Sequence, residues 1–186
     1  IRGTDNPKFL WFNEHQGNKI GRFDLTNNAL VEYSIPSVPK GGYLTYPLNI
    51  SQDPRDEKIL WFSEWNTDKI GIINGNIQIP FKILPSTKKI VLSSAIRDYS
   101  LDLEIQDNSD RPNTVFLNAS SSITSTAELG NLTVRFSPDI VDLAHDQKIK
   151  LLVHDGGVAP GNYTLGISIS DGYVTKTEFL DLYIMK

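Results

Sequence analysis

Few side chains of this 186-residue sequence have the types and spacing that chemistry requires. The absence of cysteine excludes disulfides, thiolate metal sites and cysteine nucleophiles. His145 and His154 lack metal-ligand spacing to each other or to carboxylates, and we expect His15 near a loop surface. Acidic turns at 107–110 and 155–157 offer oxygen ligands for Ca²⁺, but they match no EF-hand spacing and their residues are ordinary in turns. Because it has no Ser-His-Asp arrangement, phosphate-binding loop or dinucleotide motif, the sequence predicts no catalytic residue.

Asn-x-Ser/Thr triplets, the acceptors of N-linked glycans, begin at Asn49, Asn118, Asn131 and Asn162. Three of them fall in the C-terminal part of a cysteine-free, strand-rich chain, which favours an exported protein. Asn118, Asn131 and Asn162 are therefore candidate glycosylation sites, and we predict an extracellular or cell-surface location. The sequence starts at an isoleucine without a signal peptide, so we expect it to derive from a longer chain.

The composition predicts the elements that must position any site. The chain has 20 Ile, 9 Val and 12 Thr against 6 Ala, which favours strands over helices and predicts an all-β protein. Its net charge of −4 disfavours nucleic-acid binding, which needs clustered positive charge. No apolar run approaches the roughly 18–20 residues that cross a bilayer, so we expect no transmembrane segment.

The first half of the chain contains an internal repeat. The segment FLWFNEHQGNKIG at 9–21 returns fifty residues later as ILWFSEWNTDKIG at 59–71, with seven of thirteen positions identical. Each copy has the pattern of a strand, a polar turn and a return strand. The first copy continues into a strand at 30–36. The second continues through an Asn-Gly turn into a strand at 77–83, and 44–51 supplies one more strand before it.

These strands, recurring every 40–50 residues with a tryptophan each time, are typical of propeller blades. The LWFxExxxxKIG core and the VEYSIP segment at 31–36 resemble the blades of the virginiamycin B (streptogramin B) lyase family of β-propellers, over about residues 7–85. We expect Trp11, Trp61 and Trp65 in the blade cores, with a place near the channel surface as the alternative for Trp65. Two blades cannot close a ring of typically four to eight, so a longer parent or several chains must complete it.

The same resemblance bears on activity. Family members are Mg²⁺-dependent lyases with a histidine base and channel glutamates. In this chain Leu48 occupies the histidine position, and Tyr46 occupies that of a neighbouring acid. Glu14 and Glu64 match the family's channel carboxylates, but we expect both to belong to the blade pattern, bonding the backbone or lining the channel rim, with a metal-site role as the alternative. A lone glutamate cannot act as base and hold a metal. We therefore expect no active lyase in this chain, and Mg²⁺ only if the parent propeller is active.

The pattern changes near residue 98, where segments of period-two alternation recur with turns between them. They lie at 99–105, 114–117, 132–136, 148–153, 163–169 and 177–184 and indicate an immunoglobulin-like sandwich. The FSP segment at 136–138 and the APGNYTL segment at 159–165 resemble immunoglobulin-like domains appended to secreted bacterial and archaeal proteins. We predict two lyase-like blades over 1–90, a linker over 91–97 and the sandwich over 98–186.

These features predict an exported, non-catalytic binding or assembly module, formed by the last blades of a lyase-like propeller and an immunoglobulin-like domain. Its partner would be another protein or the missing blades that complete the ring. One alternative is a part of a Mg²⁺-dependent lyase whose histidine lies in blades outside this chain. The other is an accessory subunit of a cell-surface or membrane-associated complex, which an unpaired strand edge favours.

Overall fold

The computed structural model describes residues 8–37, 41, 44–109, 113–121, 132–144 and 147–186. Over these residues the regular structure consists of mostly antiparallel sheets and one short 3-10 turn at Trp65–Thr67, so the prediction of an all-β protein is confirmed. The chain divides into two compact units. The N-terminal unit comprises Ile1–Gln78 with Gly172–Thr175, and the C-terminal unit comprises Ile79–Asp171 with Lys176–Lys186.

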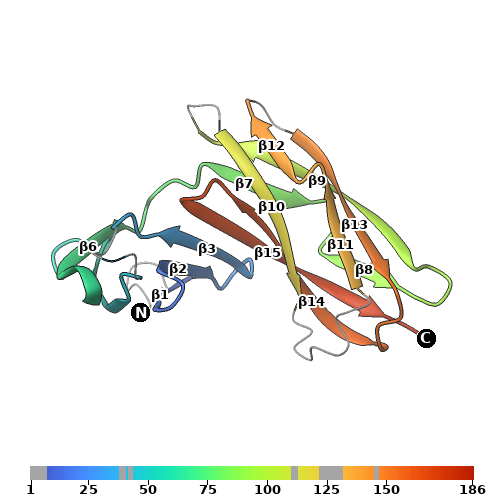
Figure 1. Ribbon diagram of the computed structural model, residues 1–186, viewed down its shortest axis with the longest axis horizontal. Coiled ribbons are helices and arrows are strands. Elements are labelled where there is room, and N and C mark those ends of the chain that lie inside the picture. The colour runs from blue at the N-terminus through green and yellow to red at the C-terminus, as the bar shows by residue number, and fades with distance from the viewer. Residues whose placement is uncertain (1–7, 38–40, 42–43, 110–112, 122–131, 145–146) are drawn as a thin grey trace. The chain divides into compact units, whose positions relative to one another are not determined.

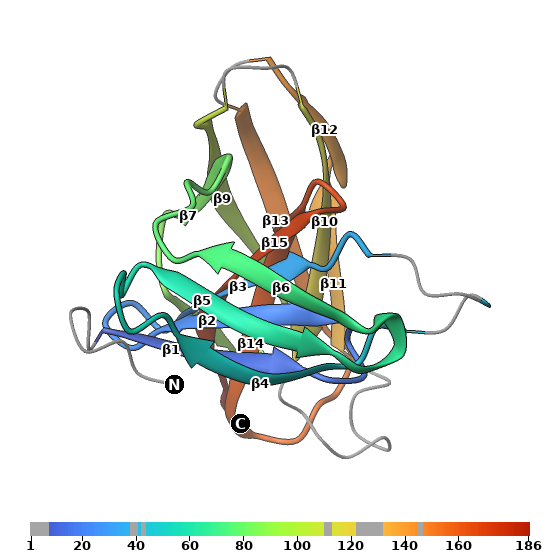
Figure 2. The ribbon, with the colours of Figure 1, turned by 90° about the vertical axis from the view of Figure 1, so that its left-hand side faces the viewer.

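The N-terminal unit contains two stacked sets of three antiparallel strands, one from each sequence repeat (Figure 2). Sheet I comprises β1 (Phe9–Glu14), β2 (Lys19–Asp24) and β3 (Ala29–Ser34). Sheet II comprises β4 (Pro47–Gln52), β5 (Ile59–Glu64) and β6 (Lys69–Asn74). Residues 172–175 belong to this unit, and the Tyr173 carbonyl accepts a hydrogen bond from the Ser34 N–H at 2.8 Å.

The two repeats fold alike because their matching residues meet the same local demands. Phe12 lies opposite Gly21 and Phe62 lies opposite Gly71, and each phenylalanine ring occupies the space that a glycine Cβ would fill. The turns before the return strands place Asn18 and Asp68 in the left-handed region, with φ of 57° and 52°. Asparagine and aspartate tolerate this conformation better than most residues. The glycine of each KIG motif is required for a different reason, because the phenylalanine ring packs where its Cβ would be.

Alternation along the strands gives each sheet two faces, named here by their aromatic residue. The Trp face of sheet I carries Trp11, Ile20, Arg22, Val31 and Tyr33, and all five are buried. The Phe face of each sheet carries the phenylalanine that covers glycine and, two residues on, a glutamate. The Trp11 and Tyr33 rings stack with centroids 6.0 Å apart, which agrees with the predicted core position of Trp11.

Sheet I turns its Trp face toward sheet II. The Arg22 guanidinium donates to the Gly75 carbonyl at 3.2 Å, just after β6, and the Trp11 ring lies 3.5 Å from the position that a Gly75 Cβ would take. The Arg22 guanidinium also lies within 6 Å of the ring centroids of Phe9, Trp11 and Tyr33. A buried arginine is thus held by aromatic faces and a carbonyl, which compensate for its desolvation.

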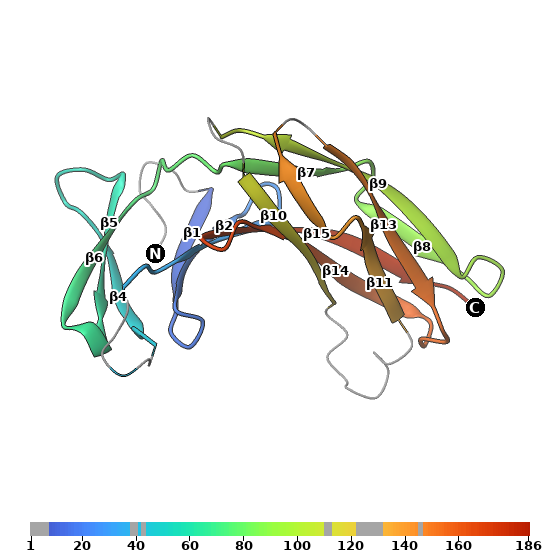
Figure 3. The same cartoon turned by 45° about the horizontal axis from the view of Figure 1, so that its top comes forward.

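The C-terminal unit has two sheets that form two layers (Figures 1 and 3). One has the order β11-β13-β9-β7, and the other has β15-β14-β10-β12 with β8 parallel to β15. Their bounds are β7 Phe81–Pro85, β8 Lys89–Leu92, β9 Asp98–Asp107, β10 Asn113–Ser121, β11 Leu132–Ser137, β12 Ile140–Leu143, β13 Gln147–Asp155, β14 Gly161–Ser170 and β15 Val174–Ile184. Every segment expected to be a strand after residue 98 is one, and β12 is an additional strand.

One predicted strand has a different partner. The sequence assigns 77–83 to the second repeat, next to the KIG strand, but β7 at Phe81–Pro85 pairs with β9 of the C-terminal unit. The reason is burial, because Phe81 and Ile83 on β7 are fully buried there. Among the described residues β6 consequently pairs with β5 alone.

Candidate functional site

The two predicted channel carboxylates end equivalent strands, Glu14 on β1 and Glu64 on β5, but their surroundings differ. The Glu64 side chain is buried, with both oxygens occupied: Oε1 accepts from the Ser37 hydroxyl at 3.1 Å, and Oε2 accepts from the Thr67 hydroxyl at 2.6 Å. Ser37 follows sheet I and Thr67 lies in the turn after β5. Glu64 therefore ties its own turn to the other repeat.

Glu14 is half-buried and lies beside a second carboxylate, Glu32 on β3. The Lys19 ammonium pairs with Glu32 at 2.7 Å. Burial and then the charge of Glu32 raise the pKa of Glu14 to about 7, while Lys19 acts in the opposite direction. Glu14 is thus partly protonated at neutral pH, which weakens it as a cation ligand there.

A metal centre needs several convergent ligands. Across the described residues, no group of three or more histidine, aspartate or glutamate side chains is placed to hold a metal ion. The residue at the family's histidine position, Leu48, lies on β4, and its carbonyl accepts a hydrogen bond from the Ser63 hydroxyl at 3.2 Å. The assignment of Glu14 and Glu64 as channel carboxylates stays a prediction.

The remaining tryptophans are less buried than Trp11. Trp61 is half-buried, and its indole N–H donates to Asp53 at 2.9 Å. Hydrogen bonds from the Arg55 N–H and then from this indole hold the pKa of Asp53 below its usual value. Trp65, at the repeat position of His15, is 67% exposed. The His15 ring packs against Tyr46 with centroids 4.7 Å apart.

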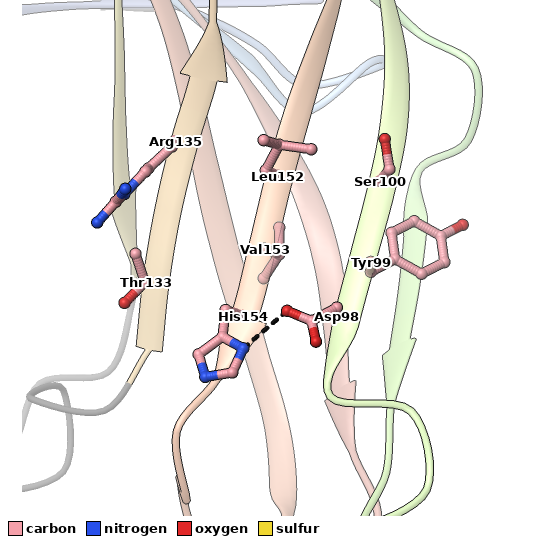
Figure 4. Close-up of a pocket in the computed structure, with 8 residues that line it drawn as sticks. All are labelled: Asp98, Tyr99, Ser100, Thr133, Arg135, Leu152, Val153 and His154. Atoms are coloured by element: carbon pink, nitrogen blue, oxygen red, sulfur yellow. Dashed lines mark hydrogen bonds and ion pairs between the residues drawn. The ribbon is translucent and has the colours of Figure 1, made fainter.

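A shallow hollow of about 480 Å³ lies on the outer face of β11, β13 and β9 in the C-terminal unit (Figure 4). On its floor His154 and Asp98 are cross-strand neighbours, with Nδ1 and Oδ1 2.8 Å apart. Ser100 lies opposite Leu152 rather than His154, whereas Thr133 on β11 lies directly opposite His154. Both side chains are at least half exposed, and a pair this exposed contributes little to stability.

The candidate glycosylation sites fall on the C-terminal unit. Asn118 is exposed on β10 with its side-chain oxygen accepting the Ala119 N–H, and Asn162 is exposed at the start of β14. Asn131 lies outside the described residues. Within the described part of the chain, no helix has the length and apolar character needed to span a membrane.

The most informative site is a sheet face that sequence reasoning missed. Ile20 and Ile70 occupy the same repeat position on the Trp faces of the two sheets, yet Ile20 is 1% exposed and Ile70 is 71% exposed. The next outward residue of β6, Ile72, is 56% exposed. Sheet II thus presents an uncovered apolar Trp face that matches a covered face in sheet I. The sequence signal for this surface was the presence of apolar residues on both faces of the repeat. That signal does not tell which of the two faces is covered.

Comparisons with known proteins assign no family. No family model matches the chain, and no curated protein matches it. Among solved structures, it is similar to domains 4 and 5 of the S-layer protein SbsC, with 14% identity and a TM-score of 0.41 over 87% of this chain and 78% of that one. A FixG-related protein from Vibrio parahaemolyticus has 8% identity and a TM-score of 0.45, over 57% of this chain and 98% of its own. Likenesses this weak carry no argument about function.

Proposed function

We propose that this chain is an exported, non-catalytic assembly module whose binding surface is the Trp face of sheet II. In this proposal sheets I and II are two propeller-type blades of the kind found in virginiamycin B lyases, and the C-terminal unit is an immunoglobulin-like sandwich. The observation that carries it is the contrast between Ile20, at 1% exposure, and Ile70, at 71%. An exposed apolar sheet face is characteristic of an interaction surface.

Two further features support binding rather than catalysis. Among the described residues β6 has one strand neighbour, so its outer edge is available to another strand. Glu64 accepts hydrogen bonds from two hydroxyls at 3.1 and 2.6 Å, which suits a structural role for this carboxylate. An accessory subunit of a cell-surface complex would use the same face. Export itself is supported by the exposed Asn118 and Asn162 triplets.

Hydroxyl-radical footprinting tests the proposed function whatever the identity of the partner. The labelling of Ile70 and Ile72 is compared between the protein in its native source material and the purified chain at high dilution. We expect protection of both residues in the native material only. Ile140, which is 52% exposed on β12, serves as the control and should be labelled equally in both samples. Equal labelling of Ile70 in the two samples would refute the proposal.

A further inference from the structure

The contact between sheets I and II shows what kind of surface fits an exposed Trp face. In this contact the Trp face of sheet I meets the Phe-face side of sheet II, where Arg22 donates to the Gly75 carbonyl at 3.2 Å. Leu60 and Phe62, on the Phe face of sheet II, are 2% and 6% exposed. A Trp face and a Phe face of this repeat therefore pack on each other within one chain.

Each of the two sheets also has one face that the other sheet does not cover, and these two open faces are again one Trp face and one Phe face. The open Trp face belongs to sheet II and carries Ile70. The open Phe face belongs to sheet I, where Leu10 is 37% exposed although its repeat equivalent, Leu60, is 2% exposed. One chain thus presents both halves of the contact that it makes internally.

Backbone hydrogen bonds establish the equivalence of the residues that meet at this contact. The Gly75 N–H donates to the Lys58 carbonyl at 2.6 Å. Fifty residues earlier, the Leu25 N–H donates to the Lys8 carbonyl at 2.8 Å. Leu25 therefore occupies in sheet I the place that Gly75 occupies in sheet II. By the same offset, Ile72 of sheet II corresponds to Arg22 of sheet I.

The residues at these positions differ between the closed and the open contact. In the closed contact the charged Arg22 meets Gly75, where an added Cβ would lie 3.2 Å from the Lys58 carbonyl. In the open faces the equivalent positions carry Ile72 and Leu25, two aliphatic side chains of equal volume. Leu25 is 42% exposed and Ile72 is 56% exposed. Covering both therefore removes apolar surface from water without burying a charge.

We propose that a second copy of this chain covers the Trp face of sheet II with the Phe face of its own sheet I. Leu25 of the second copy then packs on Trp61 and Ile72 of the first. The inference rests on the proposed function and names the partner. Because the two faces differ, the contact is head-to-tail, and it closes into a ring or continues into a chain according to its rotation.

Sedimentation of the full chain over a wide range of concentration tests this inference. We expect species larger than the 20.8 kDa monomer for the native sequence. Ile72→Glu blocks the Trp face of sheet II and Leu25→Glu blocks the Phe face of sheet I, so each variant should lose affinity by about tenfold or more. Ile140→Glu, at a similarly exposed position on β12, is the matched control and should assemble like the native chain.

Mixing the two blocked variants identifies the head-to-tail arrangement. The Ile72→Glu chain retains a usable Leu25 face and the Leu25→Glu chain retains a usable Ile72 face. An equimolar mixture should therefore form a dimer and nothing larger. Circular dichroism and urea unfolding of each variant establish that it is folded.

Three results would overturn the inference: a native chain that stays monomeric, variants that assemble like the native chain, or a mixture that forms no dimer. The first of these would leave the proposed function standing if footprinting still finds Ile70 protected in the native material. If Ile70 is not protected in the native material, both the proposed function and the inference of a second copy are refuted. Self-association and binding to another protein are thus separated by the two measurements.

Discussion

The strongest test of the two-faced arrangement compares one residue type at two equivalent positions, Ile20→Ala and Ile70→Ala. Both isoleucines follow a lysine and precede a glycine, so their local sequence is nearly identical. Ile20 is 1% exposed, and removing a fully buried isoleucine side chain costs about 2–5 kcal/mol. Ile70 is 71% exposed, and its truncation in the monomer should cost less than about 1 kcal/mol, mainly through strand propensity.

Urea unfolding followed by tryptophan fluorescence measures this difference directly. All three tryptophans lie in the N-terminal unit, so the signal reports on that unit alone. The protein is kept dilute, because self-association would add stability to the Ile70 position. We expect the midpoint to fall strongly for Ile20→Ala and slightly for Ile70→Ala, with the slope m unchanged. Equal losses of unfolding free energy would refute the assignment of covered and open faces.

Three other predictions concern the same unit. Because the pKa of Glu14 is raised to about 7, the folded state holds its proton more tightly than the unfolded state. Stability should therefore decline as pH rises from about 4.5 to 7, by about 1 kcal/mol after solvent screening, and the Glu14→Gln variant should lack this decline in pH-dependent urea unfolding. The buried Tyr33 hydroxyl has no hydrogen-bond partner among the described residues, so Tyr33→Phe should leave the free energy of unfolding in urea unchanged or raise it by up to about 1 kcal/mol. Arg22→Ile and Gly75→Leu should each destabilise the closed contact, and a double-mutant cycle should find the two changes coupled by about 1 kcal/mol, because Arg22 contacts Gly75 directly. Additive losses would contradict this contact.

Local pattern was sufficient to predict most of the strands. The repeated segments at 9–21 and 59–71 contain β1 and β5 and the starts of β2 and β6, because strand alternation and turn residues act over a few positions. The pairing of β7 could not be predicted in the same way. An alternating segment such as 81–85 fits the edge of a repeat sheet or of a sandwich equally well. Its choice of β9 depends on contacts with residues far away in the chain.

The candidate carboxylates illustrate the same limit at the level of a site. Glu14 and Glu64 follow the same LWFx sequence, and their positions at strand ends were predictable from the repeat. Their chemistry depends largely on residues outside the motif, since burial and then Glu32 raise the pKa of Glu14, while Ser37 and the turn residue Thr67 donate hydrogen bonds to Glu64. No property of the LWFxE motif distinguishes these environments.

The difference between a permanent and a separable contact lies in the residue at one repeat position. Arg22 is 8% exposed, so closing the contact between sheets I and II desolvates a charged group, which the Gly75 carbonyl of sheet II and three aromatic rings of sheet I compensate. Ile72, at the equivalent position, carries no charge and already faces solvent. When a partner covers Ile72, no charged group of this residue loses its water. When the partner leaves, no buried charge remains unpaired. The replacement of arginine by isoleucine between the repeats therefore suits sheet II to a contact that forms between separately folded chains.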